Sequence, residues 1–127
     1  MYDKDGDRPN VAADLGNTQK GDGVKFAGRG YVQLTGRSNY RRAENITGQP
    51  LIKNPDLALE QQLAADIMRH GMVEGWFTSR SFSNYLPSIG DATKSQFKKA
   101  RKIINGQDKA TSIAEYAIKF QTALNNR

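Results

Sequence analysis

The sequence predicts a mainly α-helical protein with at most a short β element, on three observations. Apolar residues recur at three- and four-residue spacings in the later part of the chain, which is the period of amphipathic helices. Glycine, proline and asparagine stand between these stretches and mark turns. With 127 residues, the chain is long enough for one core and too short for two. We therefore expect a single domain over residues 1–127, with a loop-rich segment over 1–30 and a helical core over 31–127.

The N-terminal segment is expected to be mainly loop, because it is rich in glycine, aspartate, asparagine and proline. Residues 10–15 are the exception and predict a short helix after Pro9. Residues 31–34 follow as a short strand.

The first helix of the core is expected to begin after this strand. Thr35 or Ser38 can cap its start, and the helix runs to about residue 46, where Gly48 and Pro50 end it.

A second helix opens at Pro55, which suits a first helical position, with Asn54 as its cap. Leucine, isoleucine and methionine then repeat along one face. Gly71 and Gly75 are expected to end this helix near Trp76.

The last third predicts a short helix or turn over residues 79–86 and then two longer helices. Thr93 or Ser95 begins a basic helix, and Asn105 followed by Gly106 stops it. Asp108 then caps the final helix. The apolar side chains expected to face the core from this final helix are Ile113, Tyr116, Ala117, Phe120 and Leu124.

Composition limits the class of protein. An apolar fraction of 37% and a mean hydropathy of −0.71 indicate a soluble protein. No window approaches the roughly 18 apolar residues of a membrane span, and we expect no signal peptide. The absence of cysteine excludes disulfides, Cys-ligated zinc and a thiol nucleophile. A net charge of +6 favours polyanionic surfaces.

Residues 28–40 are the most informative segment, because they concentrate glycine, neutral polar and aromatic residues more than core packing requires. Gly28 and Gly30 let the backbone take a positive φ or approach a ligand closely. Amide and hydroxyl side chains provide hydrogen-bonding groups, and two tyrosines provide flat faces. This mixture suits a sugar. The alternative is a polar strand and turn whose side chains cap neighbouring backbone groups.

The same segment resembles the GRG-x-x-QL-[ST]-x-x-x-NY signature of family 19 chitinases and the phage endolysins related to them. Residues 54–58 and 103–106 resemble the family's N-P-D-L and I-I-N-G segments, in the family's order. The prophage-type endolysins are the most similar, and their further matching segments are residues 15–18, 21–23 and 75–78. The resemblance covers residues 2–124 and implies the family's lysozyme-like fold.

The resemblance also implies roles for individual residues. The residue that matches Thr35 helps to hold the attacking water, although family chitinases usually carry serine there. Those that match Gln33, Asn39 and Asn105 contact substrate, while Asn105 can also serve simply as a helix C-cap. The full set of expected substrate-binding residues is Arg29, Tyr31, Gln33, Asn39, Tyr40 and Asn105.

The family's general-acid glutamate lies in a His-Glu-[ST] helix upstream of the GRG segment, and no such motif precedes Gly28. We therefore expect the chain to correspond to the C-terminal two thirds of the catalytic domain and to be weakly active or inactive alone. An inverting glycosidase needs two carboxyl groups roughly 6.5 to 9.5 Å apart. The sequence leaves the general acid and base unassigned. The acids nearest to the signature are Asp3, Asp5, Asp7, Asp14, Asp22 and Glu44.

Other candidate sites have simpler interpretations. Residues 3–7 place acids alternately, as a calcium loop does, but Arg8 stands where the invariant glycine belongs. We therefore expect no metal and no cofactor. Trp76 can stack on a sugar or pack in a core, and core packing is favoured. His70 is expected to be a helix-end group.

Basic side chains cluster along the helix that follows residue 93. Because no nucleic-acid-binding signature accompanies them, we interpret the charge as attraction to an anionic envelope rather than to a specific nucleic acid. Phosphate-rich polymers and lipid headgroups are the expected targets. The clustered residues are Lys94, Lys98, Lys99, Arg101 and Lys102, with Arg37, Arg41 and Arg42 extending the set.

The sequence thus predicts an endolysin-like glycoside hydrolase that cleaves β-1,4 links between amino sugars of peptidoglycan, or less favourably chitin, with inversion. Synthesis of a phage or prophage product in the bacterial cytoplasm, with action on the cell wall, fits the lack of cysteine and of a signal peptide. The alternative is a non-catalytic glycan-binding or cationic, envelope-active domain. Apolar surface left by an absent part of the domain favours self-association.

Overall fold

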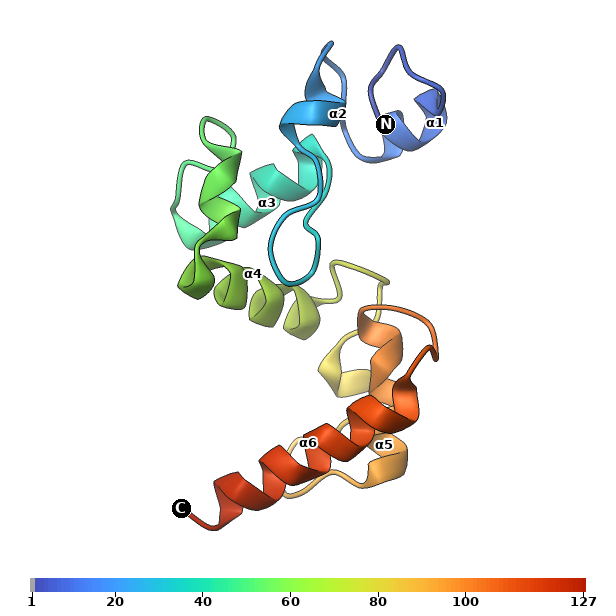
Figure 1. Cartoon of the computed structure of the whole chain (residues 1–127), viewed down its shortest axis with the longest axis vertical. Helices are drawn as coiled ribbons and strands as arrows, with labels where there is room; N and C mark the ends of the chain where they lie inside the picture. Colours follow the sequence, from blue (N-terminus) through green and yellow to red (C-terminus); the bar gives the residue numbers. More distant parts are fainter. Residues whose placement is uncertain (1) are drawn as a thin grey trace. The chain divides into compact units, whose positions relative to one another are not determined.

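The computed structural model describes residues 2–127, which form two compact units, one ending at Arg69 and the other spanning His70–Arg127. Helices are the main regular secondary structure of each unit, and each unit is described by itself (Figure 1). The expected mainly α fold is confirmed. The expectation of one domain over 1–127 stays a prediction.

The start of the first unit contains two short helices. Helix α1 (Pro9–Asp14) confirms the predicted helix and begins with its proline in the first turn. Helix α2 (Asp22–Lys25) was not expected from the sequence. It follows Gly21, whose φ of +90° places it in the left-handed region that glycine tolerates best.

Helix α3 (Arg37–Thr47) matches the first predicted core helix, but its start differs from the expected one. The residue before the helix is Gly36, and neither Thr35 nor Ser38 caps it with a side chain. The chain enters this helix at a φ of +91°, and a Cβ on Gly36 would lie 2.8 Å from the carbonyl oxygen of Leu15. Glycine is therefore required for close approach. Gly48 ends the helix with a left-handed φ of +72°, as predicted.

The second predicted helix is divided into two elements. A 3-10 helix, η1 (Pro55–Leu59), begins at the expected proline, and helix α4 (Gln61–Glu74) follows. Glu60 between them has an extended backbone, which breaks the helix. Gly71 lies inside α4, so it does not end the helix as expected; Gly75, with φ of +75°, follows its last residue.

The strand expected over residues 31–34 is absent from the described chain. These residues form a turn, and the β element is a single bridge between Arg29 and Leu34. The turn closes because Gly30 and Gln33 both have positive φ values, of +76° and +52°. An uninterrupted strand is incompatible with this geometry.

The core of the first unit is centred on Tyr40 and Phe26, which are fully buried and have ring centroids 5.2 Å apart. Aliphatic side chains from the later elements complete it. The other buried apolar residues of this unit are Ala12, Leu34, Ala43, Leu51, Ala58, Leu63, Ala64 and Ile67. The segment 28–40 contributes Leu34 and Tyr40 to this core, while residues 28–33 are exposed or half-buried.

The second unit contains a 3-10 turn, η2 (Phe82–Asn84), then helix α5 (Lys94–Ala100), the 3-10 turn η3 (Arg101–Ile103) and helix α6 (Ala110–Asn125). Helix α5 packs against α6 (Figure 1).

Of the two capping residues predicted for the starts of α5 and α6, one is confirmed and the other is not. Thr93 caps α5 as predicted, because its side chain accepts from the N–H of Gln96 while that residue's side chain accepts from the N–H of Thr93. Asp108 does not cap α6; the residue before the helix is Lys109, with a positive φ of 52°.

The prediction of which side chains of α6 face the core was wrong. Tyr116, Phe120 and Leu124 are 61%, 71% and 56% exposed, Ile113 is also exposed and Ala117 is half-buried. Small residues, Ala110 and Ala114, are buried instead. The side-chain amide of Gln121 explains this rotation, since it bonds both backbone groups of Ala92, at 2.9 and 3.0 Å. None of the helices between residues 2 and 127 is long and apolar enough to cross a bilayer.

Candidate functional site

Residues 28–36 form a narrow loop that leads directly into α3. The backbones of Arg29 and Leu34 exchange two hydrogen bonds, of 3.2 and 2.9 Å, and the N–H of Gly36 donates to the carbonyl of Phe26 at 2.9 Å. At the loop's turn, a Cβ on Gly30 would lie 2.8 Å from the carbonyl oxygen of Ala58. The loop is therefore closed at its base and held against η1 at its tip.

Three of the predicted site residues are linked by local hydrogen bonds at the start of α3. The Thr35 hydroxyl donates to the carbonyl of Gln33 at 2.6 Å, and the Gln33 amide donates to the carbonyl of Gly30 at 3.0 Å. Asn39, one turn into the helix, donates to the carbonyl of Thr35 at 2.8 Å. A Cβ on Gly28 would lie 2.9 Å from Gln33 Oε1 and 3.2 Å from Thr35 Oγ1, so the glycine leaves the space that these groups occupy.

These hydrogen bonds determine what the three side chains can offer a ligand. Gln33 is exposed, and Thr35 and Asn39 are half-buried. The single hydroxyl proton of Thr35 is used internally, so its oxygen is left to accept. The Oε1 of Gln33 and the Oδ1 of Asn39 are also acceptors. The cluster therefore suits a ligand that donates hydrogen bonds, such as the hydroxyl and N–H groups of an amino sugar or a water molecule.

Arg29 and Tyr40 were expected to bind substrate, but the structure gives both an internal role. The Arg29 guanidinium donates to the carbonyls of Lys25 and Ala27, to the Tyr40 hydroxyl and to Asp56, at 2.9 to 3.0 Å. Tyr40 is fully buried, and its hydroxyl donates to the carbonyl of Ala27 at 2.8 Å. Burial raises the pKa of Tyr40. Contact of Tyr40 with a sugar would require the side chain to leave its buried position, whereas Nη2 of Arg29 takes part in none of these hydrogen bonds.

The two remaining predicted binding residues lie at the surface. Tyr31 is 58% exposed at the turn of the loop, where its ring is available for stacking. Asn105 is exposed in the second unit, after η3, and its Oδ1 accepts from the N–H of Gly106 at 2.8 Å. That bond is a local turn contact. The substrate role of both residues stays a prediction.

A buried polar network beside the loop was missed by the sequence analysis. Asp22 is 2% exposed and accepts from Arg37 through both carboxylate oxygens, at 2.8 and 2.6 Å. Asn17, equally buried, accepts from the backbone N–H of Arg37 at 2.8 Å and donates to the carbonyl of Tyr2 at 2.7 Å. Gln19 accepts from Arg37 as well, at 2.9 Å. Only the isolated polar residues among glycines at 15–23 hinted at this network.

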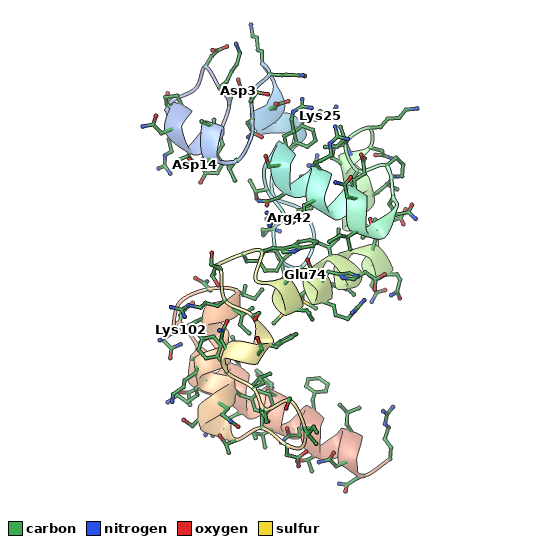
Figure 2. The ribbon with its side chains drawn as sticks, turned by 180° about the vertical axis from the view of Figure 1, so that it is seen from behind. Asp3, Asp14, Lys25, Arg42, Glu74 and Lys102 are labelled. Carbon is green, nitrogen blue, oxygen red and sulfur yellow. The ribbon has the colours of Figure 1, made fainter. Side chains whose placement is uncertain are left out.

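The carboxylates near the signature differ in their availability for catalysis. Arg37 holds the pKa of Asp22 below its ordinary value, which burial alone would raise. A general acid needs a raised pKa, so Asp22 does not fit that role. For Asp3, burial is the largest single influence and raises the pKa, but backbone N–H groups of Gly21, Gly23 and Asp5 together lower it. Asp3 accepts from Gly21 at 2.7 Å, and this part of the segment 3–7 therefore anchors the loop before α2 (Figure 2).

Glu44 is the carboxylate on α3 itself. Its Oε1 accepts from Arg41 at 2.9 Å and its Oε2 from the N–H of Ile52 at 2.9 Å. Both oxygens thus have partners within the first unit. The general acid and base stay unassigned.

The remaining candidates lie in the second unit. Trp76 is half-buried, and its indole N–H donates to Glu74 at 2.9 Å. His70 lies one turn before the end of α4, with Nδ1 4.0 Å from Oε1 of Glu74. The basic residues Lys98 and Lys99 lie in the last turn of α5, where cations interact favourably with the negative end of the helix dipole.

Comparison with known proteins gives the family of the chain. The family described as chitinase class I, glycoside hydrolase family 19, matches residues 2–123. The chain therefore belongs to this family, as its signature segment suggested. No solved structure matches the chain significantly.

Three plant proteins are similar to parts of the chain. The acidic 27 kDa endochitinase of Solanum lycopersicum is 39% identical over 75 residues, which are 59% of this chain and 28% of that protein. The acidic endochitinase Q of Nicotiana tabacum is 52% identical over 33 residues, 26% of this chain and 13% of its own length. Chitinase 8 of Oryza sativa subsp. japonica is 56% identical over 32 residues, 25% and 12% respectively. The chain thus spans only a minor part of each of these relatives.

Proposed function

We propose that the chain is a glycoside hydrolase of β-1,4-linked amino-sugar polymers, with the loop 28–36 and the start of α3 as part of its substrate cleft. The observation that carries the proposal is the acceptor cluster of Gln33, Thr35 and Asn39 in a member of the chitinase family. Gln33 and Thr35 lie next to Gly28. Internal hydrogen bonds hold the three side chains, so little conformational entropy is lost when a ligand binds.

The proposed reaction is a direct displacement with inversion at the anomeric carbon. One carboxylic acid protonates the leaving oxygen while a carboxylate activates water on the other side of the ring. The Thr35 hydroxyl would accept one hydrogen of that water, because its own proton is engaged with the carbonyl of Gln33. Gln33 and Asn39 would accept from the sugar. The two carboxyl groups are not assigned to residues of this chain.

Peptidoglycan is the proposed substrate, and the net charge of +6 supports it. A cationic protein is attracted to an anionic cell wall over long distances. This proposal includes a bacterial phage or prophage product, made in the cytoplasm, that acts on the wall. Chitin is the second candidate, because the relatives in Solanum lycopersicum and Nicotiana tabacum are named endochitinases.

A non-catalytic glycan-binding domain is the alternative function. It is favoured by Asp22, whose charge is neutralised by Arg37, and by Glu44, whose oxygens both have internal partners. If no carboxyl group of the chain is free to donate a proton, the cleft would hold glycan without cutting it.

The test is mass spectrometry of soluble products after the chain is incubated with peptidoglycan sacculi or with chitin, together with a pelleting assay. The variant carries Gln33→Ala and Asn39→Ala, and the control carries Gln61→Ala and Asn126→Ala, which change exposed residues of the same types. We expect new reducing ends from one polymer, lost only in the first variant.

The other outcomes are equally specific. Pelleting that needs Gln33 and Asn39, without products, would support the binding domain instead. Both functions would be contradicted if the chain released no products and if its pelleting did not depend on Gln33 and Asn39.

A further inference from the structure

An open pocket lies in the first unit beside the C-terminal half of α3, away from the acceptor cluster. Its volume is about 510 Å³, within the range of roughly 300 to 1,000 Å³ that small-molecule sites occupy. Arg41 and Asn39 are two residues apart on α3, about 200° around the helix, so the pocket and the cluster use different faces. The side chains that give the pocket its character are Lys25, Arg41, Glu44, Gln49 and Lys53.

The pocket has an excess of positive charge. Three cations line it, against the single carboxylate of Glu44. That carboxylate is satisfied by Arg41 and by the N–H of Ile52, at 2.9 Å each. Among residues 2–127, neither Lys25 nor Lys53 has an acidic partner. The C-terminal end of α3 contributes a negative partial charge of about half a unit, which the net side-chain charge of two cations outweighs.

The position of each cation is determined by the fold. Lys25 is the last residue of α2 (Figure 2). Its Nζ lies 5.3 Å from the centroid of the Phe26 ring. Its backbone carbonyl accepts from Arg29, which ties α2 to the loop. Lys53 follows the turn that the Glu44 contact to Ile52 holds against α3. The cations thus come from three separate segments, of which those of Arg41 and Lys53 are joined through Glu44.

We propose that this pocket is a binding site for a phosphate group. Arg41 donates from Nη1 to Glu44, which holds its guanidinium group beside the pocket, and the other N–H groups of that guanidinium can donate to phosphate oxygens. The two lysines are point charges, and lysine binds phosphate in this manner. The Gln49 amide adds neutral hydrogen-bonding groups. A phosphate in this pocket would tether an anionic polymer or surface to the protein, independently of the acceptor cluster and of hydrolysis.

The test is an NMR titration of the whole chain with sodium phosphate, at constant ionic strength against sodium chloride. We expect saturable shifts at the amides of Gly48 and Lys53 in phosphate only. The variant with Lys25→Gln and Lys53→Gln should bind phosphate at least about tenfold more weakly. The control with Lys20→Gln and Lys119→Gln changes the same number of exposed charges outside the pocket and should leave the affinity unchanged.

Further titrations identify the carrier of the phosphate. Poly(glycerol phosphate), phosphatidylglycerol vesicles and a double-stranded DNA oligomer are compared, and the carrier whose binding falls in the Lys25 and Lys53 variant alone is assigned to the pocket. Shifts that do not saturate, or that weaken equally in both variants, would overturn the proposal. Since no readout is hydrolysis, these results are separate from those for the proposed function.

Discussion

The guanidinium group of Arg37 donates to both carboxylate oxygens of Asp22, from Nε to Oδ2 at 2.8 Å and from Nη2 to Oδ1 at 2.6 Å. The Asp22 side chain is 3% exposed and the Arg37 side chain 20%. Arg37 is the first residue of α3, two residues after Thr35 and two before Asn39. The ion pair therefore fixes the end of the helix on which the acceptor cluster is built.

Loss of this ion pair should destabilise the first unit. Asp22→Asn leaves the charge of Arg37 without a counter-ion in a largely buried position, and we expect a cost of about 3 kcal/mol in the free energy of unfolding. Arg37→Lys keeps the charge but loses the two-point geometry, so it should cost less, about 1 to 2 kcal/mol. Urea denaturation measures both. Wild-type stability in Asp22→Asn would show that the pair contributes nothing to the fold.

The same pair should make stability depend on pH in the acid range. Arg37 lowers the pKa of Asp22 in the folded state. The contribution of ionised Asp22 to the free energy of unfolding is therefore fully present above the unfolded pKa of about 3.9. It is lost as the pH falls through the lower pKa of the folded state.

We expect the free energy of unfolding to decrease with falling pH below about pH 4 in the wild type, and less steeply in Asp22→Asn. Equal slopes in the two proteins would contradict the assigned pKa direction. Asp3, whose pKa is also lowered, keeps a residual slope in the variant.

Arg29 was expected to bind sugar, whereas its contacts predict a structural role. Arg29→Ala removes donors from the carbonyls of Lys25 and Ala27 and from the Tyr40 hydroxyl, and should cost about 2 to 3 kcal/mol. Asp56→Ala removes only a partner whose side chain is 73% exposed, and should cost less than about 1 kcal/mol. Thermal unfolding of the two variants gives the comparison. Equal, small losses, with glycan binding abolished only in Arg29→Ala, would support the predicted ligand role instead.

The helices could be predicted from the sequence where a strong local signal exists. Thr93 has a side chain that can cap a helix start, and Gly48 tolerates the left-handed conformation of a helix end. The start of α5 and the end of α3 were therefore predicted correctly. The rotation of α6 was not, because it depends on the amide of Gln121 reaching Ala92, 29 residues earlier. A hydrophobic pattern carries no information on such a contact.

The candidate site shows the same limit. Gln33, Thr35 and Asn39 were identified from one short segment, and local hydrogen bonds assemble them. The pairing of Asp22 with Arg37, across 15 residues, leaves no periodic signal. Tyr40 has an aromatic ring of the kind that stacks on sugars, and only the fold shows that this ring is buried beside Phe26.

Gly28→Ala tests whether the acceptor cluster needs its present geometry. The new Cβ would lie 2.9 Å from Gln33 Oε1 and 3.2 Å from Thr35 Oγ1, so both side chains must shift. Because these are side-chain atoms at the surface, we expect a stability loss under about 1 kcal/mol but glycan binding at least about tenfold weaker. Gly106→Ala, where a Cβ meets open space, is the matched control for stability. Unchanged glycan retention in Gly28→Ala would show that ligand does not use the cluster.

Phe120→Ser and Ile103→Ala test which apolar side chains stabilise the second unit. Phe120 is 71% exposed on α6, whereas Ile103 in η3 is fully buried. Little apolar area is removed from solvent at Phe120, so its replacement should change the free energy of unfolding by less than about 1 kcal/mol. Ile103→Ala leaves a cavity and should cost about 2 to 4 kcal/mol. Denaturation at several protein concentrations is the measurement, since a large, concentration-dependent loss in Phe120→Ser would mean that this face of α6 is covered by a second copy in solution.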